Sequence, residues 1–137
     1  MKAVVDTNVV AYLILGTDPY VGEARAFFAW LGEAQAPAVW EAEFANVLWM
    51  AVRHKILSIE EAATRLTMAD SLGIDSVPNR TLWQGALVRA HQSGVAVYDT
   101  LFVELAVRRQ QPLATFDGAL LKAFPKIAAR PGELMTR

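Results

Sequence analysis

Four carboxylates in the sequence stand in apolar surroundings, close to the end of an expected strand or the start of an expected helix. Asp6 follows "KAVV", Glu43 lies within "WEAEFANVL", Asp99 within "VYDTLFVELA" and Asp117 within "LATFDGALL". An ionised carboxylate is costly in such surroundings unless a positive group neutralises it. Carboxylates that gather at one place also repel one another unless they share a cation. The four side chains therefore predict a cation site.

The remaining residue types indicate which cation this site would bind. The chain has no cysteine and only two histidines, whereas Zn²⁺ prefers nitrogen and sulfur ligands. Hard cations such as Mg²⁺ or Mn²⁺ prefer oxygen ligands. We expect Asp6 and Asp99 to be direct ligands. Glu43 and Asp117 would bind through water, hold a second ion or orient an attacking water.

Each of these acids also has a simpler interpretation when it is taken alone. Asp6, Asp99 and Asp117 all stand where an N-capping residue is favoured, and Glu43 alone would be ordinary helix surface. Only the conjunction of the four favours a site. Asn46, three residues after Glu43, shares its helix face.

The acids can meet only if the intervening elements bring them to one edge of a sheet. Short apolar runs between turn residues predict strands, and apolar residues at helical spacing predict helices. Gly16 ends the first helix, Asp18 and Pro19 start the second, and Ser58 with Glu61 forms a capping box. The expected strands are 2–6, 36–39, 74–78, 112–115 and 126–129. The expected helices are 7–15, 19–34, 40–54, 59–72, 80–92, 100–109 and 118–123, with a loop or short extended piece at 95–97 and a tail at the end.

This alternation of strands and helices predicts an α/β fold with a mostly parallel five-stranded sheet flanked by helices. The 137 residues show no linker, which predicts one domain over residues 1–137. The carboxyl ends of parallel strands line the ligand crevice of such sheets, so Asp6 and Asp117 converge if their strands are neighbours. No membrane span or signal peptide is indicated, and the lack of cysteine favours a cytoplasmic location.

Together, "VVDTNVV", "WEAEFANVL", "VYDTLFVELA" and "LATFDGAL" resemble the ordered motifs of the PIN-domain ribonucleases, and of the VapC toxins of VapBC toxin–antitoxin pairs in particular. Each motif is short, but the four stand in the family's order and spacing over essentially the whole chain. The resemblance implies a PIN-like fold, an acidic site for Mg²⁺ or Mn²⁺, and endonuclease activity on RNA. It also implies a homodimer and inhibition by a cognate antitoxin.

The resemblance assigns roles residue by residue. Asp6, Glu43, Asp99 and Asp117 match the four metal-binding acids. Asn8 matches the Asn of the D-x-N opening, Asn46 the Asn that follows the second acid, and Thr115 the hydroxyl residue that supports the fourth. Phe116 departs mildly from the family, because that position is often small.

The charge balance of the chain indicates whether it could bind a nucleic acid. Without the four acids, 10 acidic residues remain against 13 Lys and Arg, a balance compatible with binding an anionic backbone. Candidate phosphate contacts are Arg53, His54, Lys55, Arg108 and Arg109, although cations near helix C-termini also stabilise the helix dipole.

The helices expected at 19–34 and 40–54 carry more apolar residues than a narrow stripe needs. Phe28, Trp30, Trp49 and Met50 widen these faces. They form either a broad core face or an exposed surface for a partner.

Three other functions compete with the nuclease. A haloacid-dehalogenase-type phosphatase requires a second Asp two residues after the first, where this chain has Asn8, and a receiver domain requires paired acids that "VVDTN" lacks. A catalytically inactive RNA-binding module stays open as well.

Overall fold

The computed structural model describes all residues, 1–137, and is built on one parallel sheet. Its strands stand in the order β3-β2-β1-β4-β5, and every neighbouring pair is parallel. The α/β prediction with five strands is thereby confirmed. The strands are β1 Lys2–Val5, β2 Glu33–Pro37, β3 Asp75–Val77, β4 Leu113–Ala114 and β5 Ala128–Ala129.

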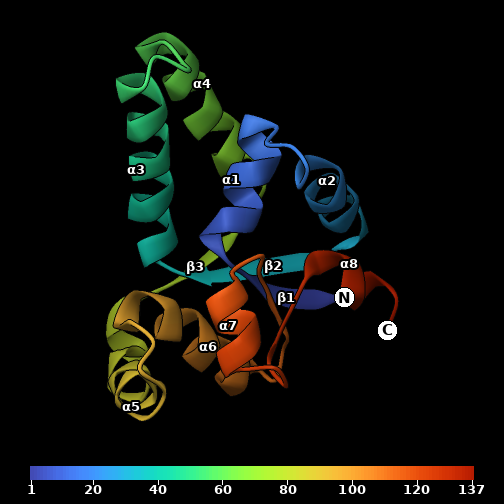
Figure 1. Cartoon of the computed structure of the whole chain (residues 1–137), viewed down its shortest axis with the longest axis vertical. Coiled ribbons are helices and arrows are strands. Elements are labelled where there is room, and N and C mark those ends of the chain that lie inside the picture. The colour runs from blue at the N-terminus through green and yellow to red at the C-terminus, as the bar shows by residue number, and fades with distance from the viewer.

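Helices cover the sheet on both sides (Figure 1). Helices α1 to α4 lie above it in that view, and α5 and α6 pack on each other below. No helix is both long and apolar enough to cross a membrane. The helices are α1 Thr7–Leu15, α2 Val21–Trp30, α3 Val39–Arg53, α4 Ile59–Asp70, α5 Trp83–Ser93, α6 Val97–Arg109, α7 Gly118–Ala123 and α8 Pro131–Met135, with a 3₁₀ turn η1 at Asn79–Thr81.

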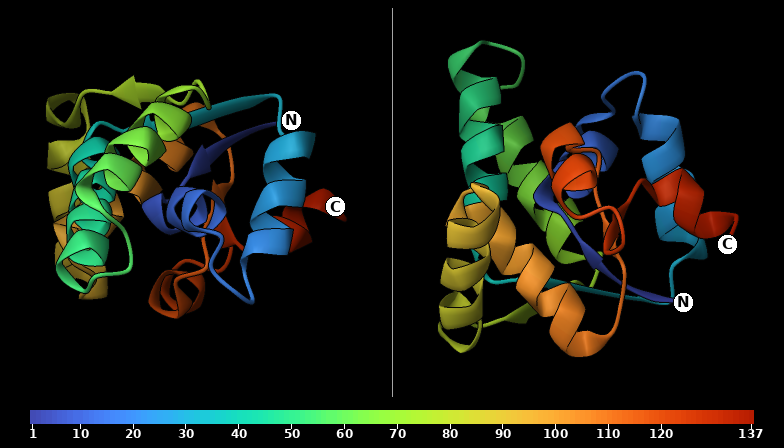
Figure 2. Two further views of the ribbon diagram at one scale, coloured as in Figure 1. Left: turned by 90° about the horizontal axis from the view of Figure 1, so that it is seen from above. Right: turned by 60° about the horizontal axis from the view of Figure 1, so that its bottom comes forward.

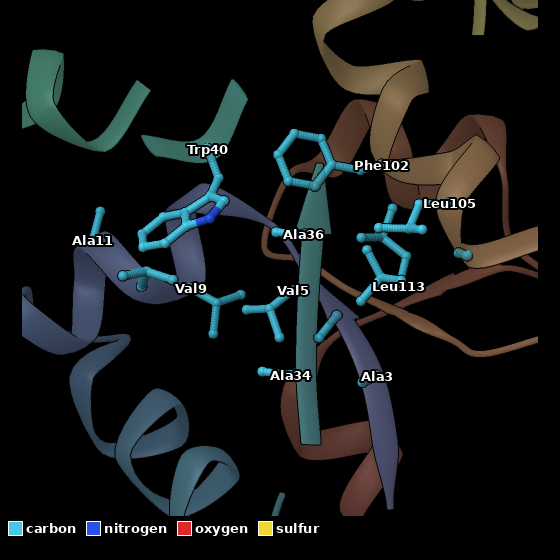
Figure 3. Close-up of a cluster of buried hydrophobic side chains, with 14 of the residues drawn as sticks. Ala3, Val5, Val9, Ala11, Ala34, Ala36, Trp40, Phe102, Leu105 and Leu113 are labelled. Carbon is cyan, nitrogen blue, oxygen red and sulfur yellow. The ribbon is translucent and has the colours of Figure 1, made fainter. Parts of the chain in front are cut away.

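The core consists of apolar side chains from both helical layers and the strands between them. Val9 from α1 and Trp40 from α3 lie on one side of β2 in Figure 3, and Leu105 from α6 lies on the other. β1 is buried from Ala3 onward, as expected for a parallel strand that helices cover on both faces. A polar side chain directly after β1 therefore stands at the carboxyl edge of the sheet.

The second helix and the second strand differ from their predictions. α2 ends at Trp30 rather than near residue 34, and β2 spans Glu33–Pro37 rather than 36–39. The backbone N–H of Gly32 donates to Met1 O, and Lys2 stands beside Glu33 in the parallel register. Residues that the helical spacing had predicted to be the end of α2 therefore form the start of β2 instead, because they pair with β1. Asp18 does not cap α2, whose N-cap residue is Tyr20.

The start of α6 is also earlier than predicted. The helix begins at Val97, after Ala96 as N-cap, so Asp99 lies inside the first turn and is not the capping residue. An acid in the first helical turn still interacts favourably with the helix dipole. Its carboxylate, however, is not used to bond a backbone N–H of its own helix.

The C-terminal residues form helix α8 rather than a tail. This helix packs against α2, as the views of Figure 2 show, and Leu134 and Pro131 are buried. Arg130, just before α8, pairs with Glu23 of α2 at 2.7 Å. Helix α8 and Arg130 thus cover a face of α2 that would otherwise be exposed to solvent.

Candidate active site

The four predicted acids come together at the point where the strand order of the sheet reverses. β1 pairs with β2 on one side and with β4 on the other. Asp6 follows β1 directly, and Asp117 stands three residues after β4. Such a switch point leaves a crevice outside the carboxyl ends of the strands. α3 and α6 bring Glu43 and Asp99 to the same crevice.

All four acids line one cavity of about 340 Å³. This volume lies within the range of pockets that bind small ligands. The other lining residues are Thr7, Asn8, Ala11, Tyr12, Leu15, Thr17 and Val47. The cavity thus combines acids from four separate segments with polar and apolar residues, most of which belong to α1.

Asp6 is buried at the floor of this cavity and is held by hydrogen bonds at both oxygens. Its Oδ1 accepts from the backbone N–H of Thr7 at 2.7 Å, so Asp6 also caps α1. Its Oδ2 accepts from the hydroxyl of Thr115 at 2.7 Å and from the amide of Asn8 at 3.4 Å. Asp6 therefore has both the capping role and the position in the site that the sequence left as alternatives.

Thr115 joins the first acid to the fourth. It is fully buried, and its hydroxyl oxygen accepts from the backbone N–H of Asp117 at 2.9 Å while its hydrogen goes to Asp6. Asp117 in turn caps α7 through Oδ1, which accepts from Ala119 N at 2.8 Å. The predicted supporting role of Thr115 thus has a direct geometric basis.

Thr7 holds the second acid. Its hydroxyl donates to Oε1 of Glu43 at 2.7 Å, and Oε2 of Glu43 accepts no hydrogen bond from the protein. Sequence reasoning missed Thr7, because its position as first residue of a helix gave no reason to expect a contact with α3. Its place directly after Asp6 was the available signal.

The electrostatics of the cavity disfavour four ionised acids. Burial, together with the charges of Asp99 and Glu43, raises the pKa of Asp6 to about 7, against hydrogen bonds from Thr115 and Thr7 that lower it. Burial and Asp99 raise the pKa of Glu43 above its usual value. Burial and Asp117 raise the pKa of Asp99. Each of these carboxylates would gain from a nearby cation.

The donor set of the cavity suits a hard divalent cation. It offers carboxylate oxygens, hydroxyls and an amide, and it has no thiol or imidazole. Oxygen atoms are the ligands that Mg²⁺ and Mn²⁺ prefer. No three His, Asp or Glu side chains, however, converge on a common point as a ready metal-binding group. The chemistry of the donors fits the ion, while the present side-chain geometry does not by itself define a metal centre.

Other predicted residues lie away from this cavity. Asn46 is exposed on α3 and does not line it. The guanidinium of Arg53 stacks on Trp49, with 5.4 Å to the ring centroid. Arg108 is bound to Glu104 and the carbonyl oxygen of Thr81, which leaves it less available for phosphate. Lys55 and Arg109 are exposed and do not line the cavity either.

Comparisons with known proteins agree with this architecture. Residues 3–127 match the family model of the PIN domain. No curated protein matches the chain in sequence.

Solved structures with the same fold include a chain of a toxin–antitoxin complex from Klebsiella pneumoniae, with a TM-score of 0.65, 21% identity, and coverage of 94% of this chain and 97% of that one. PAE2754 from Pyrobaculum aerophilum gives a TM-score of 0.71 at 19% identity over 100% of this chain and 94% of that one. VapBC2 from Rickettsia felis, bound to a DNA fragment from its promoter, gives 0.65 at 15% identity over 95% and 98%. With a family model that spans nearly the whole sequence and the expected five-stranded parallel sheet, the chain belongs to the PIN domain family.

Proposed function

We propose that this PIN domain is a divalent-metal-dependent endoribonuclease whose active site is the acidic cavity. The observation that carries the proposal is the meeting of Asp6, Glu43, Asp99 and Asp117, from four separate segments, in that one cavity. A structural role does not require four carboxylates to share a cavity in which burial raises the pKa of three of them. A bound cation would neutralise these carboxylates, and perturbed pKa values of this kind are typical of functional sites.

Mg²⁺ or Mn²⁺ bound there would supply a water of lowered pKa and neutralise the charge of the phosphoryl oxygens. The chain's own residues divide the remaining work. Asp99 is the most available ligand, because no protein group donates a hydrogen bond to its carboxylate. Asp6 is the acid whose carboxylate is held in a fixed orientation, because it accepts hydrogen bonds from Thr115 and Thr7.

Glu43 and Asp117 each keep one oxygen without a protein hydrogen bond. Oε2 of Glu43 and Oδ2 of Asp117 are the atoms that we propose accept a hydrogen bond from the attacking water, or bind the ion through a water. Thr7 holds the Glu43 carboxylate in place, and Asn8 links Asp6 to the backbone of Phe116. These supporting contacts orient the acids.

We infer further that the protein is the toxin of a toxin–antitoxin pair and a homodimer. Two of the structures with its fold are a chain of a toxin–antitoxin complex and VapBC2. Trp30 and Trp49 are 39% and 55% exposed, which leaves apolar surface for a protein partner. They lie on α2 and α3, with α1 between these helices (Figure 1), so they do not form one continuous stripe.

A divalent-ion titration with labelled RNA tests the nuclease. Cleavage that needs Mg²⁺ or Mn²⁺ and disappears with EDTA is expected. RNA binding without cleavage at any ion concentration would instead identify a binding module, and release of phosphate from small esters would identify a phosphatase.

Coexpression with the product of the neighbouring upstream gene tests the partner. A copurified complex that cleaves RNA more slowly than the free protein is expected, and light scattering of the free protein should report a dimer. Failure to recover a complex, together with a monomer at all concentrations, would remove the toxin assignment and leave the nuclease to be judged on its own.

A further inference from the structure

Three aromatic rings, two from the segment around α1 and one from the residues after β4, pack together beside the acidic cavity. Tyr12 of α1 and Tyr20 lie face to face, with 4.5 Å between ring centroids and 15° between ring planes. Phe116 contacts both, at 5.4 Å from Tyr12 and 5.1 Å from Tyr20. Tyr12 also lines the cavity itself. The cluster therefore continues directly into the site.

Phe116 is tied to the acids by its backbone. Its N–H donates to Oδ1 of Asn8 at 3.2 Å, and the amide of Asn8 donates to Asp6. Asp117 is the next residue along the chain. The backbone of Phe116 is thus held in place relative to two of the four carboxylates.

Arg130 supports the cluster. Its guanidinium lies 5.1 Å from the centroid of Phe116 and 5.9 Å from that of Tyr20. Glu23 holds this guanidinium at 2.7 and 3.3 Å, and also accepts from Gly132 N at 2.9 Å. An ion pair anchored in α2 and in the first turn of α8 therefore fixes the charge against the rings.

The exposure of the cluster distinguishes it from the core. Phe27, Phe44 and Phe102 are fully buried, whereas Tyr12, Tyr20 and Phe116 are all partly exposed. Aromatic rings that serve only packing gain most from full burial. Rings held rigidly at a polar cavity, with surface left to solvent, suit a flat ligand.

We propose that Tyr12, backed by Tyr20 and Phe116, is a stacking site for a nucleobase of single-stranded RNA next to the phosphate in the acidic cavity. This inference rests on the proposed nuclease function and adds how the substrate is held. Stacking requires an unpaired base that has left its helix. The cluster thus predicts a preference for single-stranded over duplex RNA, and for the larger purine over the pyrimidine.

Fluorescence anisotropy with labelled oligonucleotides tests the stacking site. Three 12-nucleotide probes are used: oligo(A), oligo(U) and a strand of ribose phosphates that lacks bases. Each is titrated with Mg²⁺ present and in an Asp99→Asn background, so that cleavage does not interfere. Tyr12→Leu is compared with Tyr12→Phe, and with Trp83→Leu, which removes an exposed ring that does not line the cavity.

Tyr12→Leu should weaken oligo(A) binding by about 5- to 100-fold, the usual range for a lost base–aromatic stack, and should leave the abasic strand unaffected. Tyr12→Phe and Trp83→Leu should keep the parent ratio of oligo(A) to abasic affinity. Because both affinities are measured on the same protein, a partly unfolded variant does not change their ratio.

An unchanged ratio in Tyr12→Leu would overturn the stacking site and leave the nuclease intact. Equal losses for oligo(A) and the abasic strand are one form of that result, and they would show a role of Tyr12 in shape or charge. Absence of RNA binding to any of the proteins, with no cleavage by the wild type, would contradict both the stacking site and the proposed function.

Discussion

Asp99 is the acid of the cavity that the protein itself holds least. It lies in the first turn of α6 without capping it, and its pKa is raised by burial and by the charge of Asp117. An amide in its place would remove a repulsive charge and break no hydrogen bond that the fold uses. A substitution of Asp99 therefore tests function with less effect on stability than a substitution of Asp6, which caps α1 and binds Thr115.

We expect Asp99→Asn to melt in EDTA at the wild-type temperature or up to about 4 °C higher. Relief of one repulsion at a half-buried site is worth about 1 kcal/mol or less, which corresponds to this shift in a domain of this size. Differential scanning calorimetry measures it. A fall of several degrees would mean that Asp99 has a structural hydrogen-bonding role.

Thr115 presents the opposite case, because its hydroxyl serves two acids at once. Thr115→Val keeps the side-chain shape, removes the bond to Oδ2 of Asp6 and leaves the N–H of Asp117 without an acceptor. Unsatisfied buried groups cost about 1–3 kcal/mol. Urea unfolding should show this loss, while Thr115→Ser, which keeps the hydroxyl, should lose less. Equal stability of Thr115→Val and wild type would contradict the linking role.

Several site residues could be predicted from sequence because each stands at the edge of an element. Asp6, Asp117 and Thr115 follow strands, and the ends of parallel strands meet by geometry. Thr7 and Tyr12 could not be found in this way. Their contacts, with Glu43 on α3 and with Phe116 after β4, join segments that sequence spacing alone does not place side by side.

Among the elements, α5 and α6 are joined by an ionic group whose link between Glu104 and Arg89 no local pattern indicated, although Glu104 and Arg108 stand at i,i+4 spacing. Glu104 of α6 accepts from Nε of Arg89 at 2.7 Å and from Nε of Arg108 at 2.9 Å, and its side chain is only 11% exposed. Gly85 of α5 leaves the space for this carboxylate, since a Cβ there would collide with it. Close approach of the two helices thus depends on one glycine and one acid.

Glu104→Gln should lower the free energy of unfolding at pH 7 by about 1–3 kcal/mol, because two charge-assisted hydrogen bonds lose their charge. Burial alone raises the pKa of Glu104, but the bonds from Arg89 and Arg108 outweigh it and hold the pKa below its usual 4.5. The stabilisation is therefore present above pH 4.5 and disappears as the pH falls through the lowered pKa.

Urea unfolding of wild type and Glu104→Gln at a series of pH values checks this expectation. The difference between the two proteins should shrink steadily below pH 4.5. A difference that is constant with pH would show that the ionised form of Glu104 does not stabilise the fold.

The boundary between α2 and β2 shows why element ends are harder to predict than the elements themselves. Ala24, Phe27, Phe28 and Leu31 follow helical spacing, and Gly32 directly after them is a residue type that often follows a helix end. The backbone leaves the helix at Leu31, and the next residues pair with Met1 and Lys2. That partner strand lies some thirty residues away, outside any local window.

At the scale of the whole molecule, the two ends of the chain lie close together and close the fold around α2 (Figure 2). β1 forms the centre of the sheet, and α8 packs on α2 through Leu134, which is 1% exposed, and through the Arg130–Glu23 pair. The short, polar C-terminal sequence gave no periodic signal for this helix. Helix α8 is stabilised by contacts with α2, an element far away in the sequence, just as β2 is stabilised by pairing with β1.

Leu134→Ala should destabilise the protein by about 2–4 kcal/mol, because it opens a cavity beneath α8. Chemical denaturation measures the loss, and Glu133→Ala, at an exposed position of the same helix, is the control that should change little. If both variants matched the wild type, α8 would not be part of the cooperative fold.

The proposed function of the molecule depends on cleavage of RNA in the acidic cavity with a divalent ion. The initial rate of cleavage of a labelled RNA at saturating Mn²⁺ tests it most directly, for wild type, Asp99→Asn and Asp70→Asn, an exposed acid that does not line the cavity. We predict that Asp99→Asn is slower by about 100-fold or more, as expected when a group acting in the transition state is removed. Asp70→Asn should keep the wild-type rate. Equal rates for Asp99→Asn and wild type, or cleavage that persists in EDTA, would contradict the claim.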